Sequence, residues 1–320
     1  MLKHLILIIF IAPFVIFAQK IEGFINDKLI SFEVKDNQLN GSYTAYQKTL
    51  DNKGETSKWP VLPFVTGNFS NGQRIGIWTL YDEKGNVKFE RNYSSPFEFE
   101  QTTPELPDNN AIQLLAKQVY YPIKDSNQFY NYFPLQEREV SIISRVWREL
   151  PAEKNTELVN QNIFNDILIK LANGEITAYN HEQFTDTVSR ITFKDLTDLE
   201  LISFRIKEDF FIDITRQMSE TRIIGLCPVV KKSEDAEPEE LCWLYYPSIR
   251  SFLSEYKVDI NDPKIENLED LVFYRNINGS IYKDNRLDAM HEELTKIHPA
   301  FNDCYLFELE HEYWKKITGN

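Results

Sequence analysis

Glycine and cysteine are both scarce in this chain, which has 11 glycines and three cysteines among 320 residues. A phosphate-binding loop needs several glycines in a short stretch, and the sequence has neither a Walker loop nor a dinucleotide-binding glycine fingerprint. The cysteines also lack the short paired spacing that is typical of a zinc site. The sequence therefore excludes these two classes of site and predicts no cofactor and no metal.

Positive charge is also in deficit, with 35 lysines and arginines against 49 aspartates and glutamates, a net charge of −14. A chain this acidic repels phosphate groups, so nucleic acid and anionic membrane surfaces are unsuitable partners. After residue 18, no apolar run is long enough to span a bilayer. We therefore expect a protein that does not insert directly into a membrane.

The first 18 residues have the pattern of a secretory signal peptide. Lys3 and His4 form a short basic start, residues 5–17 are apolar, and Ala18 precedes the expected cleavage site. An uncleaved anchor helix is the alternative, although the apolar run is short for a membrane span. Because no cysteine follows Ala18 directly, we expect no lipid at the mature N-terminus. The mature chain is predicted to be soluble and extracytoplasmic.

The histidines do not predict catalysis. His181, His291, His298 and His311 show no HExxH spacing, because His291 and His298 are two helical turns apart. The sequence also lacks the GxSxG motif of a nucleophile elbow, and we find no other catalytic set. We therefore predict that the chain is not an enzyme.

Aromatic residues are abundant, with 22 Phe, 16 Tyr and 5 Trp, and between residues 19 and 100 they follow a weak internal repeat. The segment GSYTAY at residues 41–46 matches GIWTLY at residues 76–81, and a Lys-Gly turn follows each. Turns of this kind between strands with alternating aromatic residues indicate hairpins. The pattern resembles the hairpin repeats of MORN-type and YwqK-like proteins. An ordinary antiparallel sheet without repeat ancestry is the alternative.

Residues 101–136 read as a linker followed by an extended aromatic segment. Pro104 and Pro107 stand among acidic residues, which is typical of a connection between domains. The aromatic residues between positions 120 and 133 fit either an interaction arm or a loop packed on its own domain. We therefore predict that residues 19–100 form a separate domain, whose removal leaves residues 137–320 folded.

Residues 137–320 alternate between strand and helix patterns. Alternation of period two and short apolar runs predict an antiparallel meander with strands at residues 202–207, 210–215, 222–230 and 241–246. Helical spacing predicts covering helices at residues 139–150, 162–172, 248–256, 268–275 and 287–297. Gly174 is the expected left-handed cap of the second helix. The predicted fold class is α+β, with an N-terminal antiparallel hairpin domain before a mixed core.

Cys227 and Cys242 lie on the two predicted strands that flank an exposed, charged loop at residues 231–240. If the turn centres near Asp235, the two cysteines face each other within about one residue of register. In an oxidising compartment such a pair can form a disulfide. Two small buried thiols fit the pattern equally well.

Several short motifs, in a shared order, resemble the GldN/PorN family. They are RVWR at residues 145–148, GEITAY at 174–179, KEDFFIDITRQM at 207–218, RIIGLCPVV at 222–230 and CWLYYPSIR at 242–250. The segments at residues 276–283 and 309–314 continue the resemblance towards the C-terminus. The resemblance covers the chain from about residue 139 onwards and leaves the first 100 or so residues outside it.

The resemblance implies a non-enzymatic structural subunit of a periplasmic ring in the type IX secretion and gliding-motility machinery. It implies a homo-oligomeric ring, held at the inner side of the outer membrane by a GldK/PorK-like lipoprotein and working with GldL/GldM-like motor components. The alternative function is a periplasmic binding or immunity-like protein built on the N-terminal hairpins.

Interfaces favour aromatic and arginine side chains as anchors. On this ground we select seven candidate interface residues, and we expect at least half of them to lie in the core instead. They are Trp147, Arg148, Trp243, Tyr245, Tyr246, Tyr313 and Trp314.

Overall fold

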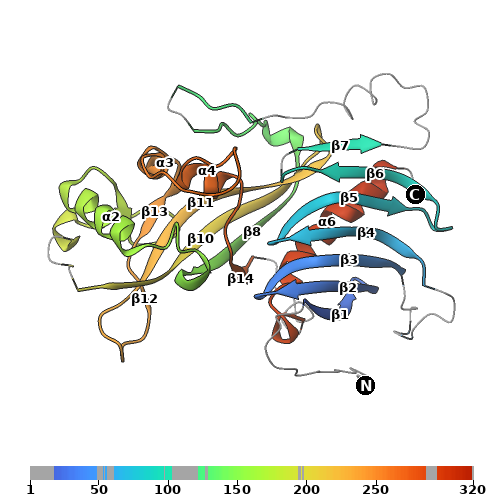
Figure 1. Ribbon diagram of the computed structural model, residues 1–320, viewed down its shortest axis with the longest axis horizontal. Coiled ribbons are helices and arrows are strands. Elements are labelled where there is room, and N and C mark those ends of the chain that lie inside the picture. Colours follow the sequence, from blue (N-terminus) through green and yellow to red (C-terminus); the bar gives the residue numbers. More distant parts are fainter. Residues whose placement is uncertain are drawn as a thin grey trace.

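The computed structural model describes residues 18–48, 53, 55, 61–96, 98–102, 122–126, 129–193, 196, 198–285 and 294–318. In this part of the chain, two antiparallel sheets lie side by side, and helices pack against both (Figure 1). The α+β class with an N-terminal hairpin sheet is therefore confirmed. The predicted signal peptide up to residue 17, and residues 103–121 of the predicted linker, lie outside the described residues.

The first sheet is a meander in which each strand pairs with the next. Its strands are β1 (Gln19–Ile25), β2 (Lys28–Lys35), β3 (Gln38–Lys48), β4 (Pro63–Ser70), β5 (Gln73–Tyr81), β6 (Val87–Tyr93) and β7 (Phe99–Thr102). Three tight turns, at residues 26–27, 36–37 and 71–72, place two successive residues at positive φ. This geometry suits a twisted hairpin, and Asn, Asp and Gly tolerate it best. The hairpins are thus explained by their turns, whereas descent from MORN-type repeats stays a prediction.

The second sheet has the strand order β14-β8-β10-β11-β13-β9, and β12 pairs with β11. Its strands are β8 (Val140–Pro151), β9 (Ala178–Tyr179), β10 (Glu200–Asp213), β11 (Met218–Lys231), β12 (Glu239–Glu240), β13 (Trp243–Tyr245) and β14 (Ser280–Asp284). Three short 3₁₀ turns accompany them: η1 (Glu137–Glu139), η2 (Ala152–Lys154) and η3 (Arg190–Phe193). The long hairpin of β10 and β11 is the centre of this sheet.

Strand β8 stands where the sequence predicted a helix at residues 139–150, so that prediction is wrong. Its residues pair with β10 from Val140 to Pro151. The strand is buried on both sides, because Val146 and Leu150 face one way, Trp147 faces the other, and all three are buried. An apolar pattern on both faces of a strand also satisfies helical spacing, which explains the error.

The predicted meander of four strands needs two further corrections. The strands expected at residues 202–207 and 210–215 are one strand, β10, because Lys207 and Glu208 continue the ladder with β11 across a bulge. The fourth strand is short, because Tyr246 already begins α3 and Pro247 lies in the first turn of that helix. The sheet is antiparallel as predicted, but β8 supplies its remaining long strand.

Three helices cover one face of the second sheet: α2 (Gln161–Asn173), α3 (Tyr246–Ser254) and α4 (Leu268–Phe273). Asn160 caps α2 by accepting a hydrogen bond from the amide of Asn162 at 2.9 Å, and Gly174 ends it at a φ of 77°. These helices confirm three helix predictions with small shifts in bounds. Of the helix predicted at residues 287–297, only residues 294–297 are described, and they are helical.

The C-terminal helix α6 (Phe301–Ile317) covers the first sheet (Figure 1). Trp314 meets Phe89 with ring centroids 5.2 Å apart, and Phe301 meets Phe32 at 4.9 Å. The apolar face of the first sheet is therefore closed by a helix from the other end of the chain. A separate domain at residues 19–100 stays a prediction, but the second layer that this sheet needs to bury its apolar face comes from α6, which lies outside those residues.

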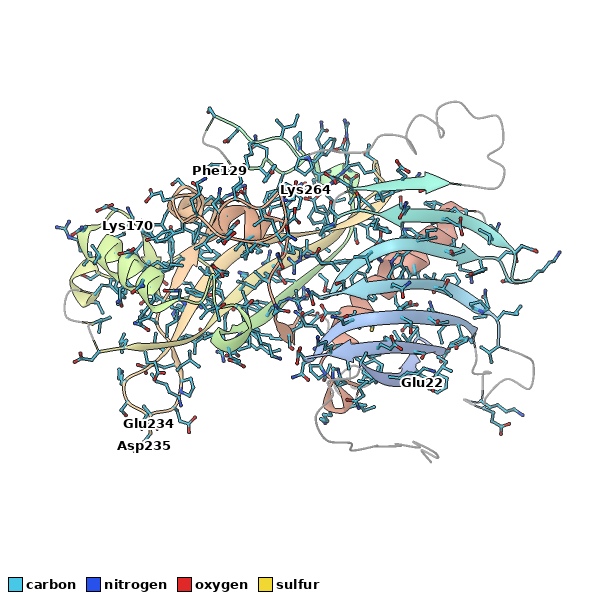
Figure 2. All side chains as sticks on the ribbon, in the orientation of Figure 1. Glu22, Phe129, Lys170, Glu234, Asp235 and Lys264 are labelled. Carbon is cyan, nitrogen blue, oxygen red and sulfur yellow. The ribbon has the colours of Figure 1, made fainter. Side chains whose placement is uncertain are left out.

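The described part of the aromatic segment, residues 122–126 and 129–136, packs on its own domain. Tyr130 stacks on Phe273 with ring centroids 5.3 Å apart. Arg250 donates a hydrogen bond to the Tyr130 carbonyl and lies 4.4 Å from the ring centroid of Phe129, which Figure 2 labels. Of the two interpretations, the packed loop is the one that this part of the chain adopts.

Candidate interaction surface

The face of the second sheet opposite α2, α3 and α4 is called here the outer face. The helices cover the side that carries Leu150, Phe204 and Leu226. Successive residues of a strand point to opposite sides of a sheet. Trp147 on β8 and Cys227 on β11 therefore lie on the outer face.

An aromatic cluster forms the centre of the outer face. Its three buried residues and two partly buried neighbours are Trp147, Cys227, Trp243, Tyr179 and Phe184. A Cβ atom on Gly225 would come within 2.6 Å of the Phe184 ring, so the absence of a side chain lets Phe184 lie close to the strand. The ammonium of Lys283 lies 3.9 Å from the ring centroid of Trp147, a cation–π contact. The centre of the face is thus apolar and closely packed.

Ion pairs between arginine and carboxylate side chains surround the aromatic cluster. Arg145 donates two hydrogen bonds to Asp209, at 2.7 and 2.8 Å. Arg205 lies between Glu149 and Glu240, at 3.3 and 2.9 Å. Because these side chains are partly exposed, each pair contributes only about 0–1 kcal/mol to stability. Their effect is to hold charges at defined positions, which gives a surface specificity more than affinity.

Lys207 is the buried cation of the outer face. Its ammonium donates a hydrogen bond to the Glu182 carbonyl at 2.6 Å. Burial, assisted by the nearby charge of Arg145, lowers the pKa of this lysine. The hydrogen bond fixes the loop at residues 180–187 over the sheet, so Lys207 positions that loop and does not itself face solvent.

Large apolar side chains remain exposed around the aromatic cluster. Tyr245 and Tyr282 are 40% and 42% exposed, and Ile143 is 56% exposed. Tyr245 contacts Phe184 edge-on at 5.4 Å, and the Arg205 guanidinium lies 4.8 Å from the Tyr282 ring centroid. Exposed aromatic rings beside fixed charges have the composition of interface anchors. The outer face is therefore our candidate interaction surface.

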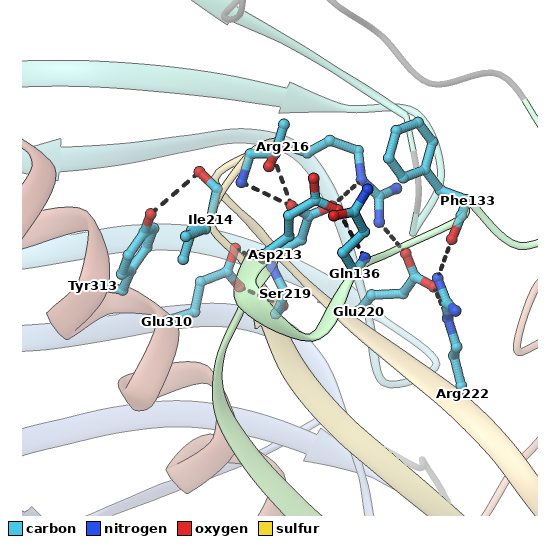
Figure 3. Close-up of polar contacts among 12 residues, drawn as sticks. Phe133, Gln136, Asp213, Ile214, Arg216, Ser219, Glu220, Arg222, Glu310 and Tyr313 are labelled. Atoms are coloured by element: carbon cyan, nitrogen blue, oxygen red, sulfur yellow. Dashed lines mark hydrogen bonds and ion pairs between the residues drawn. The ribbon is translucent and has the colours of Figure 1, made fainter.

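The seven candidate interface residues divide by exposure. The five that are buried are Trp147, Arg148, Trp243, Tyr246 and Trp314. Tyr245 is exposed, and Tyr313 is partly exposed, with its hydroxyl 3.5 Å from the carbonyl of Ile214 (Figure 3). Of the seven, a partner can therefore reach Tyr245 and Tyr313 without rearrangement of the fold.

Arg148 points away from the outer face, towards α6. Its guanidinium donates hydrogen bonds to the Gly279 carbonyl at 2.8 Å and to Asp303 at 2.7 Å, and Glu208 lies at 3.3 Å. Although burial disfavours the charged form, the carboxylates of Asp303 and Glu208 raise the pKa of Arg148. This arginine therefore joins β8 to α6 and is a structural residue.

A protein-family model described as "Gliding motility associated protein GldN" matches residues 135–315, a span that contains the whole second sheet and all of α6 except its last two residues. The match covers more than half of the chain. The chain belongs to the GldN family. No curated protein matches it. Membership of the GldN family makes the chain a component of the gliding-motility and type IX secretion machinery, in a family of structural proteins.

The GldN match begins after the first sheet, but the packing of the chain does not divide at that point. The first sheet lies outside the matched residues, whereas α6, which closes that sheet, lies inside them up to Lys315. Leu306 of α6 also packs against Phe210 in the second sheet. The GldN part of the chain and the added N-terminal sheet therefore share one helix.

A buried charged cluster between α6 and the first sheet, named here the junction cluster, was missed by sequence analysis. Its members are Lys28, Arg74, Arg91, Glu308, Glu310 and His311. Glu308 pairs with Lys28, and Glu310 pairs with Arg74. Ser219 of the second sheet donates to Glu310 at 2.6 Å (Figure 3). The available signal was the spacing of three between residues 308 and 311, which places both on one face of a helix.

Burial and pairing together set the protonation states in the junction cluster. Although burial opposes ionisation, Lys28 and His311 lower the pKa of Glu308 to about 2. Burial lowers the pKa of His311, whose Nδ1 lies 2.7 Å from Glu308 and whose Nε2 lies 3.3 Å from Arg74. A neutral imidazole satisfies both contacts, because it donates to the carboxylate and accepts from the guanidinium. The cluster is therefore an ionic and hydrogen-bonded contact that joins the two sheets.

Two negative findings apply to the described residues alone. Among them, no group of three or more His, Cys, Asp or Glu side chains is placed to hold a metal ion. Within the same part of the chain, no helix has both the length and the apolar character needed to cross a membrane. Of the histidines considered above, His291 lies outside the described residues.

Cys227 and Cys242 are both free and buried, and they lie on opposite faces of the sheet. Cys227 packs with the aromatic cluster, whereas Cys242 packs with the core under the helices. Leu226 pairs with Leu244 and Val229 pairs with Glu240, so the register of β11 shifts by one residue between β13 and β12, and both cysteines lie at this shift. Both thiols are free, so the structure contains no bridge between Cys227 and Cys242.

We expect the thiols of Cys227 and Cys242 to remain free in the native protein isolated without a reducing agent. Burial raises the pKa of Cys242 to about 12 and raises the pKa of Cys227 well above its usual value, so the reactive thiolate is scarce. Mass spectrometry of non-reduced peptides should find the two cysteines in separate peptides. Alkylation after denaturation, when all three cysteines become accessible, provides the control. A linked peptide containing both residues would show that this arrangement is wrong.

Proposed function

We propose that the chain is a non-enzymatic structural subunit of a periplasmic ring in the type IX secretion and gliding-motility machinery. The observation that carries the proposal is the GldN match over residues 135–315. A homo-oligomeric ring needs two different surfaces that meet head to tail between neighbouring copies. The outer face, with its packed centre and exposed aromatic residues, is suited to be one of the surfaces by which the subunit contacts its neighbours.

Attachment to the outer membrane is assigned, within this proposal, to a GldK/PorK-like lipoprotein, and GldL/GldM-like components are the proposed motor partners. The support is the predicted signal peptide, which is not followed by a lipid-bearing cysteine. The exposed Tyr245 and Tyr282 and the oriented ion pairs of the outer face are the proposed contacts.

A periplasmic binding or immunity-like role for the first sheet is the alternative function. It rests on the hairpin pattern alone, and α6 closes the apolar face of that sheet. Ile75 and Ile77, which are 44% and 56% exposed, remain as apolar residues through which the sheet could bind a ligand. The GldN match favours the ring subunit, because it spans the second sheet and the helix that holds the first sheet in place.

We expect the double substitution Tyr245→Ala and Tyr282→Ala to reduce recovery of the lipoprotein partner at least tenfold. Loss of two exposed aromatic anchors from the centre of an interface costs about 2 kcal/mol or more, which corresponds to such a change in affinity. The measurement is a pull-down of the tagged full-length chain from membranes, with identification of the recovered proteins by mass spectrometry and the size of the complex by gel filtration.

Tyr81→Ala is the matched control, because Tyr81 is a partly exposed tyrosine of the first sheet, away from the outer face. Recovery of the lipoprotein by this variant should equal that of the wild-type chain. A wild-type chain that stays monomeric and recovers no lipoprotein, under conditions that preserve other envelope complexes, would sink the ring proposal. Equal recovery by all three chains would instead remove the outer face from the interface.

A further inference from the structure

Strand β1 is an edge of the first sheet (Figure 1). It pairs with β2 over its whole length and without a register shift. Their hairpin closes at Ile25 and Lys28, around a two-residue turn at positive φ. In such a hairpin the closing pair exchanges backbone hydrogen bonds, and the bonds then alternate along the strand. The backbone groups of Lys20, Glu22 and Phe24 therefore point away from β2, towards the free edge.

These outward groups form a regular row of unused donors and acceptors. Among the described residues, the outward N–H and C=O groups of Lys20, Glu22 and Phe24 have no hydrogen-bond partner. Proteins usually protect such an edge with a proline, a bulge or an unpaired charge. β1 has seven residues, with neither a proline nor a bulge, and its lysine is paired with Glu22 at 2.8 Å. An edge of this kind can accept a further strand.

The charge pattern of β1 is complementary to itself in one antiparallel register. If two copies of β1 pair about a twofold axis at Ile21, Lys20 lies opposite the partner's Glu22, and the same pair recurs on the other side of the axis. Both residues have outward backbone groups, so each pair also exchanges two backbone hydrogen bonds. Glu33 of β2 already lies opposite Lys20, which would then stand between two carboxylates. Opposite charges directly across two strands stabilise their pairing.

The neighbouring registers lack this match. An axis at Glu22 places two glutamates opposite each other, and an axis at Lys20 does the same with two lysines. Like charges in directly opposed positions destabilise a strand pair. The side chains of β1 therefore select a second copy of the same strand, in the register centred at Ile21.

We propose that two copies of the chain associate through β1, as an antiparallel strand pair about a twofold axis at Ile21. The pairing joins their first sheets into one continuous sheet, and a twofold contact uses the same surface of both copies. Because the strand is short, the contact area is small, and we expect a Kd on the order of 100 µM. The site is independent of the ring proposal, because β1 lies outside the GldN match and away from the outer face.

The test is sedimentation equilibrium of the full mature chain, with any tag at the C-terminus. The wild-type chain should change from monomer to dimer between about 10 µM and 1 mM. Lys20→Glu sets glutamate against glutamate at both paired positions, and Glu22→Lys sets lysine against lysine. Each variant should therefore raise the dimer Kd at least tenfold. The Lys20 and Glu22 side chains are 61% and 49% exposed, so neither substitution should change the denaturation midpoint by much.

A mixture of the two variants gives the sharpest result. In a heterodimer the two lysines of one chain face the two glutamates of the other, so mixing should restore a dimer with nearly the wild-type Kd. Failure of the mixture to associate, although each variant is folded, would overturn the proposed register. A loss of strand structure alone would not be repaired by mixing.

Lys84→Glu is the matched control, because it makes the same change of charge at an exposed lysine in the turn between β5 and β6. It should dimerise as the wild-type chain does, and equal Kd values for Lys84→Glu and Lys20→Glu would overturn the proposal. The Tyr245→Ala and Tyr282→Ala double variant should keep the β1 dimer while it loses the lipoprotein, which separates this contact from the ring. A wild-type chain that stays monomeric up to about 1 mM would show that β1 does not pair with itself.

Discussion

Truncation of the chain after Ala300 is expected to unfold the first sheet, although the deleted helix belongs to the opposite end of the sequence. Without α6, Phe32 and Phe89 lose their ring contacts with Phe301 and Trp314. Removal of one large buried aromatic side chain costs about 3–5 kcal/mol, so the loss of two approaches the whole stability of a domain. Hydrogen exchange of residues 19–48 and 61–96 should show that the protection of this sheet is lost.

A truncation after Ile317 is the control, because it keeps the whole of α6. It should retain protection in the first sheet close to that of the full chain. The reciprocal deletion of residues 19–100 should expose the apolar side of α6 and promote aggregation, in place of the intact core that the sequence predicted. A first sheet that stays protected without α6 would show that its fold does not depend on the helix.

Glu310→Gln is expected to lower the free energy of unfolding by about 3–5 kcal/mol, because it leaves buried arginines without their carboxylate. Glu310 is 0% exposed, pairs with Arg74 and approaches Arg91, which are 7% and 0% exposed. It also accepts hydrogen bonds from the amide and hydroxyl of Ser219, at 3.0 and 2.6 Å. Urea denaturation followed by tryptophan fluorescence provides the measurement, since Trp78 and Trp314 are both near the cluster.

Glu312→Gln is the matched control on the same helix. The Glu312 side chain is 42% exposed, so loss of its pair with Lys28 should cost at most about 1 kcal/mol. Similar losses in the free energy of unfolding for the two substitutions would show that burial does not increase the contribution of Glu310 to stability.

The pH dependence of the Glu310→Gln effect gives a second test. Although burial favours the protonated acid, Arg74 and Arg91 lower the pKa of Glu310 below its ordinary value of 4.5. The stabilising contribution of a group with a lowered pKa is fully present above pH 4.5 and is lost as the pH falls through the folded-state pKa. The stability difference between the wild-type chain and the variant should therefore narrow below pH 4.5. A difference that stays constant into acid would show that the carboxylate charge is not its origin.

Local signals in the sequence predicted those elements whose own residues mark where the element begins and ends. Helix α2 is one example, because Asn160 caps its start, Gly174 ends it and its apolar side is regular. The exposed charged loop before Trp243 is another, as Glu234 and Asp235 project from the sheet in Figure 2. Such elements depend on neighbours in the chain, so a sequence pattern describes them well.

Elements buried on both sides were the ones that sequence patterns misassigned. Strand β8 reads as a helix because Trp147 fills the outer face while Val146 and Leu150 fill the opposite one. Most of the candidate interface residues proved to be buried for a related reason. A tryptophan such as Trp314 is suited equally to a core and to an interface. Composition alone does not distinguish these two locations.

By itself, the sequence determined the hairpin turns of the first sheet, the helix α2 and the ordered motifs that resemble the GldN/PorN family. Only the tertiary structure decided that α6 closes the first sheet, that Cys227 and Cys242 face opposite ways, and that Glu310 is shared by two arginines. The physical reason is the separation of the partners along the chain. Lys28 and Glu308 are 280 positions apart, and neither residue carries a local signal for the other. Contacts of this kind form only when the complete sheets and α6 have packed together.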